Sequence, residues 1–246
     1  MKNRQHNSLN TPPYCLGSAD CKHCAIRDTM LFCSIDSENL DHLFEPVDNL
    51  RYPVKSQIYT QGEQGNDIFS IRHGLIKLVQ DQPDGSQRIV RLLGAKDVFG
   101  IEALLSEPYH HTAIVLQELS VCRIPVVSLV QLKAKNSSLN ERVMECWDRH
   151  LSLCDQWLTT LVSGSIKVRL INFLLALKKL NENNSGALQL INYEDIASII
   201  GSSRETVTRI IAELKISGVI QKGATSKEIN FNSDTLKDLR KKKGSA

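Results

Sequence analysis

Two short helices joined by a glycine turn are the feature that most restricts the fold of this chain. Within residues 192–218, Asn192 is a good N-cap for a short amphipathic helix, which Gly201 ends. Ser202 then opens a second helix with Glu205 three residues on, the spacing of a capping box, and Gly218 ends that helix. The pattern predicts a helix-turn-helix motif.

The second of these helices has an apolar edge and a polar edge. The apolar edge, predicted to face the core, holds Val207, Ile210, Ile211 and Leu214. The polar edge holds Ser203, Arg204, Glu205, Thr208 and Arg209. The first turns of the second helix enter the major groove of DNA in helix-turn-helix proteins. The polar edge is therefore the candidate base-reading surface.

The side chains on this polar edge have the chemistry of base recognition. Arginine can contact guanine through two hydrogen bonds, glutamate can accept from cytosine, and the threonine methyl can touch thymine. The alternative is an ordinary surface helix, in which Glu205 only caps the helix and pairs with Arg209 four residues on. We favour base reading, because phosphates repel an acidic side chain that does not read a base.

The C-terminal third of the chain completes a DNA-binding domain around this motif. Residues 166–246 contain 14 lysine and arginine residues against 8 aspartate and glutamate residues, whereas the remainder is slightly acidic. A helix is predicted from Ile166 to about Leu180, and residues 219–231 read as two short strands around a Gly-Ala-Thr-Ser turn. We therefore predict a winged helix-turn-helix domain over residues 166–246.

A longer helix is predicted over residues 137–162. Its apolar positions recur at spacings of three and four, and they are Leu139, Val143, Cys146, His150, Leu153, Trp157 and Leu161. Such a seam packs either on its own domain or, as we favour, on a second copy of the chain. Residues 163–165, Ser-Gly-Ser, end the helix and have the composition of a hinge.

Residues 35–130 have the pattern of short strands separated by turns. A turn is expected at His73 and Gly74, a hairpin turn at residues 83–86, and separate strands at 98–99, 113–116 and 119–124. Short strands at this spacing are typical of an antiparallel barrel or jelly roll. The predicted fold class is therefore α+β.

The first 34 residues form a polar arm that carries four of the seven cysteines, Cys15, Cys21, Cys24 and Cys33. The arm cannot build an apolar core of its own. No apolar run approaches the roughly 18 residues that a membrane helix needs, and the N-terminus lacks a secretory signal. We therefore expect a cytoplasmic protein whose cysteines are not a disulfide framework.

The cysteine spacing permits several sites. Cys21 and Cys24 can reach one metal centre, with Cys33 further along the arm and Cys122 in a predicted strand. Four thiolates suit a [4Fe–4S] cluster, a structural zinc ion fits the same spacing, and a C-x-x-C dithiol switch is a third reading. Cys146 and Cys154 are expected to be inert and buried. Haem ligation by His73, His110 or His111 is a remote alternative.

The stretch IASIIGSSRETVTRIIAELKISGVI resembles the helix-turn-helix of the CRP/FNR superfamily, and GEQGNDIFSIRHGLIKL resembles its N-terminal β-roll. The resemblance covers nearly the whole chain, and the helix over residues 137–162 falls where the family has its dimerisation helix. It implies a cyclic-nucleotide-binding-like β-roll over residues 35–130, a dimerisation helix and a winged helix-turn-helix. It also implies a regulator that is not an enzyme.

The resemblance also separates two branches of the family by their ligands. Members that bind cyclic AMP use a glutamate and an Arg-Ser pair; here Gly100, Glu102 and Ala113 match, but His111 and Thr112 replace that pair. A buried phosphate needs a fixed cation, so no cyclic nucleotide is expected. The FNR branch has a clustered arm with a C-x2-C pair and a distant cysteine in V-C-x-I-P, and His110–His111 also resembles it.

Carried over residue by residue, the FNR resemblance assigns Cys21, Cys24, Cys33 and Cys122 as iron–sulfur ligands. The interval from Cys24 to Cys33 is longer than in the family pattern, so Cys15 is a reserve ligand. The resemblance implies an oxygen-sensing activator of anaerobic regulation, in which a [4Fe–4S] cluster promotes dimerisation. Its expected partners are palindromic double-stranded DNA, RNA polymerase and a second copy. The alternative is the same regulator with zinc or a dithiol switch.

Overall fold

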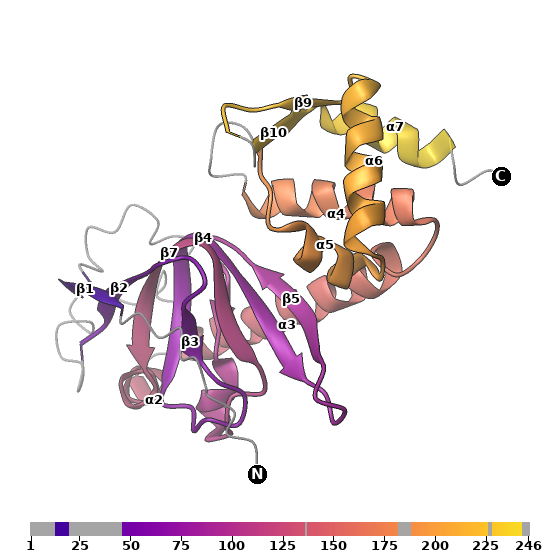
Figure 1. Cartoon of the computed structure of the whole chain (residues 1–246). Coiled ribbons are helices and arrows are strands. Elements are labelled where there is room, and N and C mark those ends of the chain that lie inside the picture. Colours follow the sequence, from indigo (N-terminus) through magenta and orange to yellow (C-terminus); the bar gives the residue numbers. More distant parts are fainter. Residues whose placement is uncertain (1–12, 20–45, 136, 182–187, 226–227, 243–246) are drawn as a thin grey trace, which may run out of the picture. The chain divides into compact units, whose positions relative to one another are not determined.

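The computed structural model describes residues 13–19, 46–135, 137–181, 188–225 and 228–242 (Figure 1). The chain divides into two compact units. One comprises Met1–Gln87 and Leu92–Cys146, and the other comprises Arg88–Arg91 and Trp147–Ala246. Among the described residues, no helix combines the length and the apolar character that crossing a bilayer requires.

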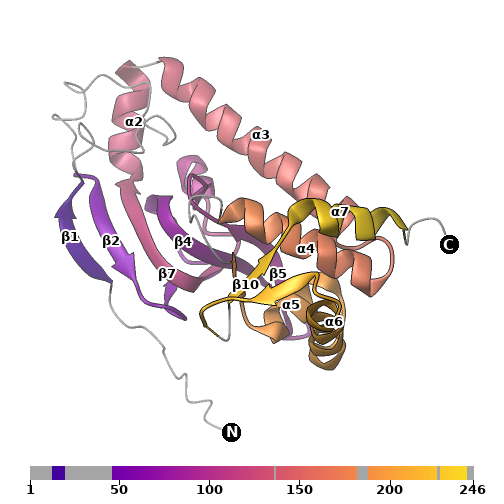
Figure 2. The ribbon, with the colours of Figure 1, turned by 90° about the horizontal axis from the view of Figure 1, so that it is seen from above.

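The N-terminal unit is built on an antiparallel sheet. Strands β1, β2, β7, β4 and β5 lie side by side in that order, as Figure 2 shows, while β3 also pairs with β7 and β6 with β4. The strands are β1 Tyr14–Ser18, β2 Asp48–Tyr52, β3 Gln57–Tyr59, β4 Asp67–Asp81, β5 Gln87–Leu93, β6 Val98–Phe99 and β7 Thr112–Pro125. A short 3-10 helix, η2 (Ile101–Leu105), precedes β7. The expected antiparallel N-terminal domain is confirmed.

The turn expected at His73 and Gly74 is wrong, because β4 runs without a break from Asp67 to Asp81. The register with β7 shifts on both sides of His73, and Gly74 has a φ of 102°. A Cβ on Gly74 would lie 2.8 Å from the Leu119 Cα, so this glycine lets two backbones approach closely within a continuous ladder. The prediction of two separate strands at 113–116 and 119–124 is also wrong, because both runs belong to one continuous strand, β7.

The arm and the end of the roll add detail to the sequence pattern, and the predicted hairpin turn is confirmed. Part of the arm is regular, because β1 pairs with the edge of the roll at β2 and so satisfies its backbone without a core of its own. Residues 126–130 are not in a strand, since α2 (Val126–Lys135) begins directly after β7. The turn at residues 83–86 is confirmed by the hydrogen bond from the Gln82 N–H to the Ser86 carbonyl, 2.8 Å long.

The helices after the roll begin with α3 (Ser137–Thr160), close to the predicted bounds. The C-terminal unit then contains α4 Ile166–Leu180, β8 Leu188–Gln189, α5 Tyr193–Ile200, α6 Arg204–Ile216, β9 Ile220–Lys222, β10 Glu228–Phe231 and α7 Ser233–Lys242. Strands β8, β10 and β9 form a small sheet in that order. The hairpin of β9 and β10 is the predicted wing, and the predicted helix-turn-helix is α5 and α6.

Local capping explains why these helices begin where they do. The Ser165 hydroxyl caps α4 directly after Gly164, whose φ is 85°. The Asn192 side chain accepts from the Asp195 N–H at 2.7 Å, as expected from the sequence. Helix α7 was not anticipated, because Leu236 is the one residue of this polar segment that the structure buries completely among those described.

Candidate DNA-reading helix and cysteine site

Helix α6 begins one residue later than the sequence predicts. Ser203 is its N-cap, with extended backbone angles and a hydroxyl that accepts from the Thr206 N–H. Ser202 still belongs to the turn, since its own N–H donates to the Ala197 carbonyl of α5. The capping box from Ser202 to Glu205 is therefore wrong. Glu205 is the second residue of the helix, where a negative charge faces the positive end of the helix dipole.

The structure separates the two edges of α6 as the sequence predicts. Val207, Ile210, Ile211 and Leu214 are buried. The exposed edge carries all five candidate reading residues, which are Ser203, Arg204, Glu205, Thr208 and Arg209. They come from two successive turns of one helix, so a single DNA groove can meet them together.

Each candidate reading side chain already has a partner in the free protein. Arg204 pairs with Glu194 of α5 at 3.2 Å, and the Thr208 hydroxyl donates to the Arg204 carbonyl, which leaves the threonine methyl for a thymine. The N–H of Glu205 and the Ser203 hydroxyl lower the pKa of the fully exposed Glu205 carboxyl, so it stays a hydrogen-bond acceptor. Such exposed pairs are weak, about 0.2–1 kcal/mol, and DNA can replace them.

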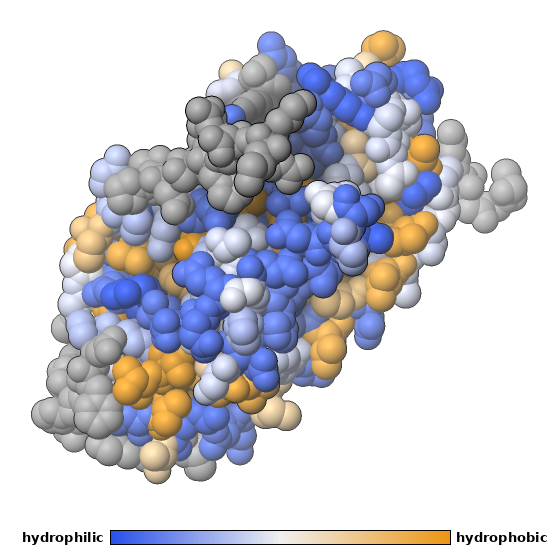
Figure 3. Space-filling model, turned by 60° about the horizontal axis from the view of Figure 1, so that its bottom comes forward, coloured by the Kyte–Doolittle hydropathy of each residue, from blue (hydrophilic) through white to orange (hydrophobic). Residues whose placement is uncertain are grey.

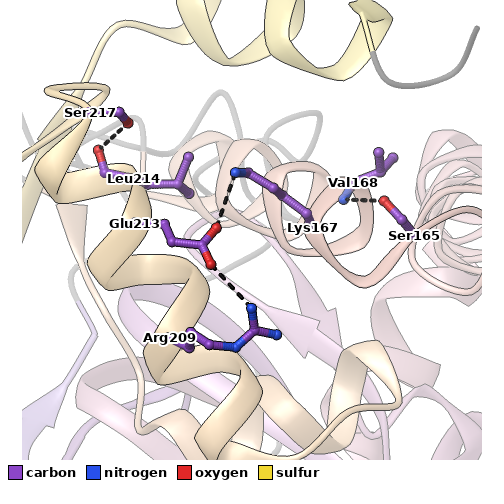
Figure 4. Close-up of polar contacts among 7 residues, drawn as sticks. All are labelled: Ser165, Lys167, Val168, Arg209, Glu213, Leu214 and Ser217. Carbon is purple, nitrogen blue, oxygen red and sulfur yellow. Dashed lines mark hydrogen bonds and ion pairs between the residues drawn. The ribbon is translucent and has the colours of Figure 1, made fainter. Parts of the chain in front are cut away.

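The sequence analysis missed three polar residues on or beside α6, which are Glu213, Lys167 and Arg169. Arg209 pairs with Glu213, not with Glu205, and Lys167 of α4 contacts the same Glu213 carboxylate (Figure 4). Arg169 of α4 donates to the Ile200 carbonyl at 2.7 Å and so holds the end of α5. The spacing of four between Arg209 and Glu213 is a signal that could have found that pair. Nothing local points to the two α4 residues.

Of the four proposed cluster ligands, the structure describes only Cys122. Cys21, Cys24 and Cys33 lie outside the described residues. Cys122 lies on β7, is 6% exposed, and has the Arg72 Nη1 at 3.7 Å from its Sγ. Within the part of the chain that the structure describes, no three His, Cys, Asp or Glu side chains gather as a metal site would require.

Strand register places Cys15 away from Cys122. Cys15 is opposite Leu50, and Leu50 is opposite Val121, so these three side chains share one face of the sheet. Cys122 follows Val121 along β7 and therefore points to the other face. The exposed Cys15 is thus poorly placed to act as the reserve ligand beside Cys122.

The stretch that resembles a cyclic-nucleotide motif is tied into the roll. Gly100 has a left-handed conformation before η2, and the buried Glu102 carboxylate accepts from the His110 N–H at 3.0 Å. The Thr112 hydroxyl accepts from the Gln61 N–H at 3.0 Å. Glu102 and Thr112, two of the residues that match or replace the family's ligand groups, therefore already serve the backbone of the roll.

Helix α3 has two apolar stripes, and the predicted seam is the less accessible one. In the single chain, Leu139, Val143 and His150 of α3 are buried, as is Leu161 directly after the helix, and Leu153 and Trp157 are half-buried. Exposed hydrophobic side chains form a neighbouring stripe of α3, Met144, Trp147, Leu151 and Leu158, and Val162 just beyond the helix is exposed too.

In Figure 3, hydrophobic side chains follow a diagonal line at the right of the view, where α3 runs. Spacing alone does not say which stripe faces the chain itself, so the seam read from the sequence stays a prediction. Cys146 and Cys154, expected to be buried, are partly exposed.

Comparisons with known proteins identify a family domain in each part of the chain. A family model of the cyclic nucleotide-binding domain matches residues 49–136, and one of the Crp-like helix-turn-helix domain matches residues 168–232. The transcriptional activator protein anr of Pseudomonas aeruginosa is 26% identical over 88% of this chain and 90% of its own. A CRP-like cAMP-activated global transcriptional regulator of Mycobacterium tuberculosis is 25% identical over 72% of this chain and 80% of its own.

A solved structure agrees with the fold. FixK2 from Bradyrhizobium japonicum superimposes with a TM-score of 0.70 at 20% identity, covering 79% of this chain and 98% of that one. The two family models together match more than half of the chain, in the order roll and then helix-turn-helix. The chain therefore belongs to the CRP/FNR family of DNA-binding transcription regulators, whose members are not enzymes.

Proposed function

We propose that this regulator acts in the cytoplasm as an oxygen-responsive homodimer, with a [4Fe–4S] cluster held by Cys21, Cys24, Cys33 and Cys122. The observation that carries the proposal is the setting of Cys122, a buried thiol with the Arg72 guanidinium beside its sulfur. A guanidinium N–H beside the sulfur can donate to it, and the thiolate is the form of cysteine that binds metal. The residues described therefore fit a thiolate ligand at this position.

The chain's own residues determine how such a site would form. The roll supplies Cys122 from a rigid strand, while the arm supplies the C-x2-C pair and Cys33. A bound cluster contributes oxygen-sensitive redox chemistry. Binding by the arm cysteines would link the arm to β7, in addition to the pairing of β1 with β2.

Anaerobic purification tests this assignment directly. We expect a brown protein with about four iron and four sulfide ions per chain, the content of one [4Fe–4S] cluster. A colourless protein with one zinc ion per chain would overturn the iron–sulfur proposal in favour of a structural zinc site at the same cysteines. Cyclic AMP is a further control, because one relative is activated by it. If Glu102 and Thr112 keep their backbone partners, adding cyclic AMP should not change the affinity of this protein for DNA.

We further propose that the dimer forms through the exposed stripe of α3 and binds palindromic promoter sites. Four large hydrophobic side chains on one face of α3, and Val162 just beyond its end, otherwise remain in water. Their spacing of three, four or seven residues is that of a two-helix seam. A two-fold dimer presents two copies of α6, so each half-site of a palindrome meets the same reading edge. The DNA-bound dimer is proposed to activate transcription by recruiting RNA polymerase.

Base reading by α6 gives the first quantitative expectation. Arg209→Ala should reduce specific affinity by about tenfold to a hundredfold and remove the preference for one guanine per half-site, since a bidentate arginine–guanine contact is worth about 1–3 kcal/mol. The measurement is a competition titration against a randomised half-site library at constant salt. Val219→Ala, which changes a half-buried apolar side chain after α6, is the control and should retain the preference. Intact preference in Arg209→Ala would show that this edge does not read bases.

A further inference from the structure

Glu213 links two helices of the DNA-binding domain through one carboxylate. Its Oε1 lies 3.2 Å from the Arg209 Nη1 of the same helix, and its Oε2 lies 3.3 Å from the Lys167 Nζ of α4. Figure 4 shows the carboxylate between the two cations, with Arg209 and Lys167 on opposite sides of it. Each carboxylate oxygen therefore has its own cationic partner.

The two cations of this cluster differ in exposure. The Lys167 side chain is 26% exposed, whereas that of Arg209 is 67% exposed. Lys167 is the second residue of α4, two positions after the Ser165 cap, so its backbone is held at a capped helix end. Lys167 is the less exposed of the two partners and fixes the position of the Glu213 carboxylate. The carboxylate in turn restricts the position of the Arg209 guanidinium.

Glu213 is one of two acidic side chains on the same stripe of α6 as Arg209. Glu205, Arg209 and Glu213 follow one another at intervals of four, so they lie along one stripe of the helix. An anion here repels phosphate. Lys167 offsets that repulsion, because the Lys167–Glu213 pair is neutral. Glu213 can therefore orient Arg209 while lowering the affinity for DNA only slightly.

The hydrogen-bond geometry of arginine leaves Arg209 able to read a base while it is held. A guanidinium has five N–H groups, and the contact to Glu213 uses Nη1. The Nε and Nη2 edge remains available for the two acceptors of a guanine. An arginine held on one side loses less rotamer entropy when it meets its base, and it is less available to swing onto a phosphate.

We propose that Glu213 is a specificity-determining residue, which aims the Arg209 guanidinium at the base edge and withholds it from the phosphates, with Lys167 as its anchor. The proposal rests on base reading by Arg209. It gives Glu213 and Lys167 a positioning role, since neither needs to touch DNA.

The test compares Glu213→Gln and Lys167→Met with the wild-type protein in its DNA-binding form. For Glu213→Gln, non-specific affinity should rise and the ratio of specific to non-specific affinity should fall by about two- to fivefold, the range that one exposed ion pair supplies. Lys167→Met should lower the ratio in the same direction by a smaller factor. Binding to the preferred site, to a site with the guanine replaced and to unrelated DNA is titrated at several salt concentrations.

A matched control separates charge from positioning. Asp238→Asn removes one negative charge from the exposed side of α7 and should change all affinities by one common factor, leaving the ratio unchanged. In Arg209→Ala, adding Glu213→Gln should have no further effect on the ratio. If Glu213→Gln keeps the wild-type ratio while Arg209→Ala loses it, the role of Glu213 is overturned and base reading stands. If both keep it, both proposals are overturned.

Discussion

Cys122→Ser is expected to abolish the iron–sulfur cluster and, with it, specific DNA binding under anaerobic conditions. A serine hydroxyl is far harder to ionise than a thiol, so a serine beside Arg72 does not replace the thiolate. The remaining three cysteines leave one iron without its protein ligand. Iron and sulfide content after anaerobic purification, together with titration of a specific site, measures both losses. The same result is expected for Cys21→Ser, Cys24→Ser and Cys33→Ser.

The controls for this series come from the other cysteines. Cys146→Ser and Cys154→Ser on α3 should keep wild-type cluster content. Cys15→Ser should do so too, because its strand register turns it to the opposite face from Cys122. A full cluster in Cys33→Ser together with its loss in Cys15→Ser would contradict the assignment. Since Cys122 is buried, thermal unfolding of the apoproteins shows whether its replacement damages the roll itself.

The C-terminal motif was predictable because its signals are local. Asn192, Gly201 and the apolar positions of α6 act within a few residues of themselves, and each appears in the structure in its predicted role. The one error, the choice of Ser202 over Ser203 as the cap, arises because adjacent serines have the same side chain. The backbone decides between them: the Ser202 N–H is still bound to Ala197 of the preceding helix.

The failures elsewhere involve partners distant in sequence. Gly74 has the composition of a turn, but its reason is the β7 backbone some 45 residues on, which no local pattern contains. Strand β1 depends on β2 across the undescribed residues 20–45, and Lys167 meets Glu213 across 46 residues. Only Cys122 among the proposed ligands can be placed, and its neighbour Arg72 is likewise supplied by sheet pairing. A sequence shows which side chains could form a site, and long-range pairing shows which of them meet.

Leu151→Asp should convert the dimer into monomers. Leu151 is 64% exposed in the single chain, so an aspartate there leaves the monomer fold almost unchanged. In a two-fold dimer the change occurs twice. It removes two leucines, each worth about 1.5–3 kcal/mol when buried, and brings unpaired charges into an apolar seam. The dimer should weaken by at least about a hundredfold, as measured by sedimentation equilibrium of the anaerobic protein, and affinity for a palindromic site should fall with it.

Neighbouring positions on α3 show whether this effect belongs to the exposed stripe. Ser152→Asp adds the same charge one residue away, at an exposed polar position off the stripe, and should remain dimeric. Leu153→Asp enters the half-buried stripe of the same chain, so its main effect should be a lower unfolding temperature. A monomeric but stable Leu153→Asp beside a dimeric Leu151→Asp would reverse the two stripes. In that case the seam read from the sequence would be the true interface, and the exposed side chains of α3 would need another partner.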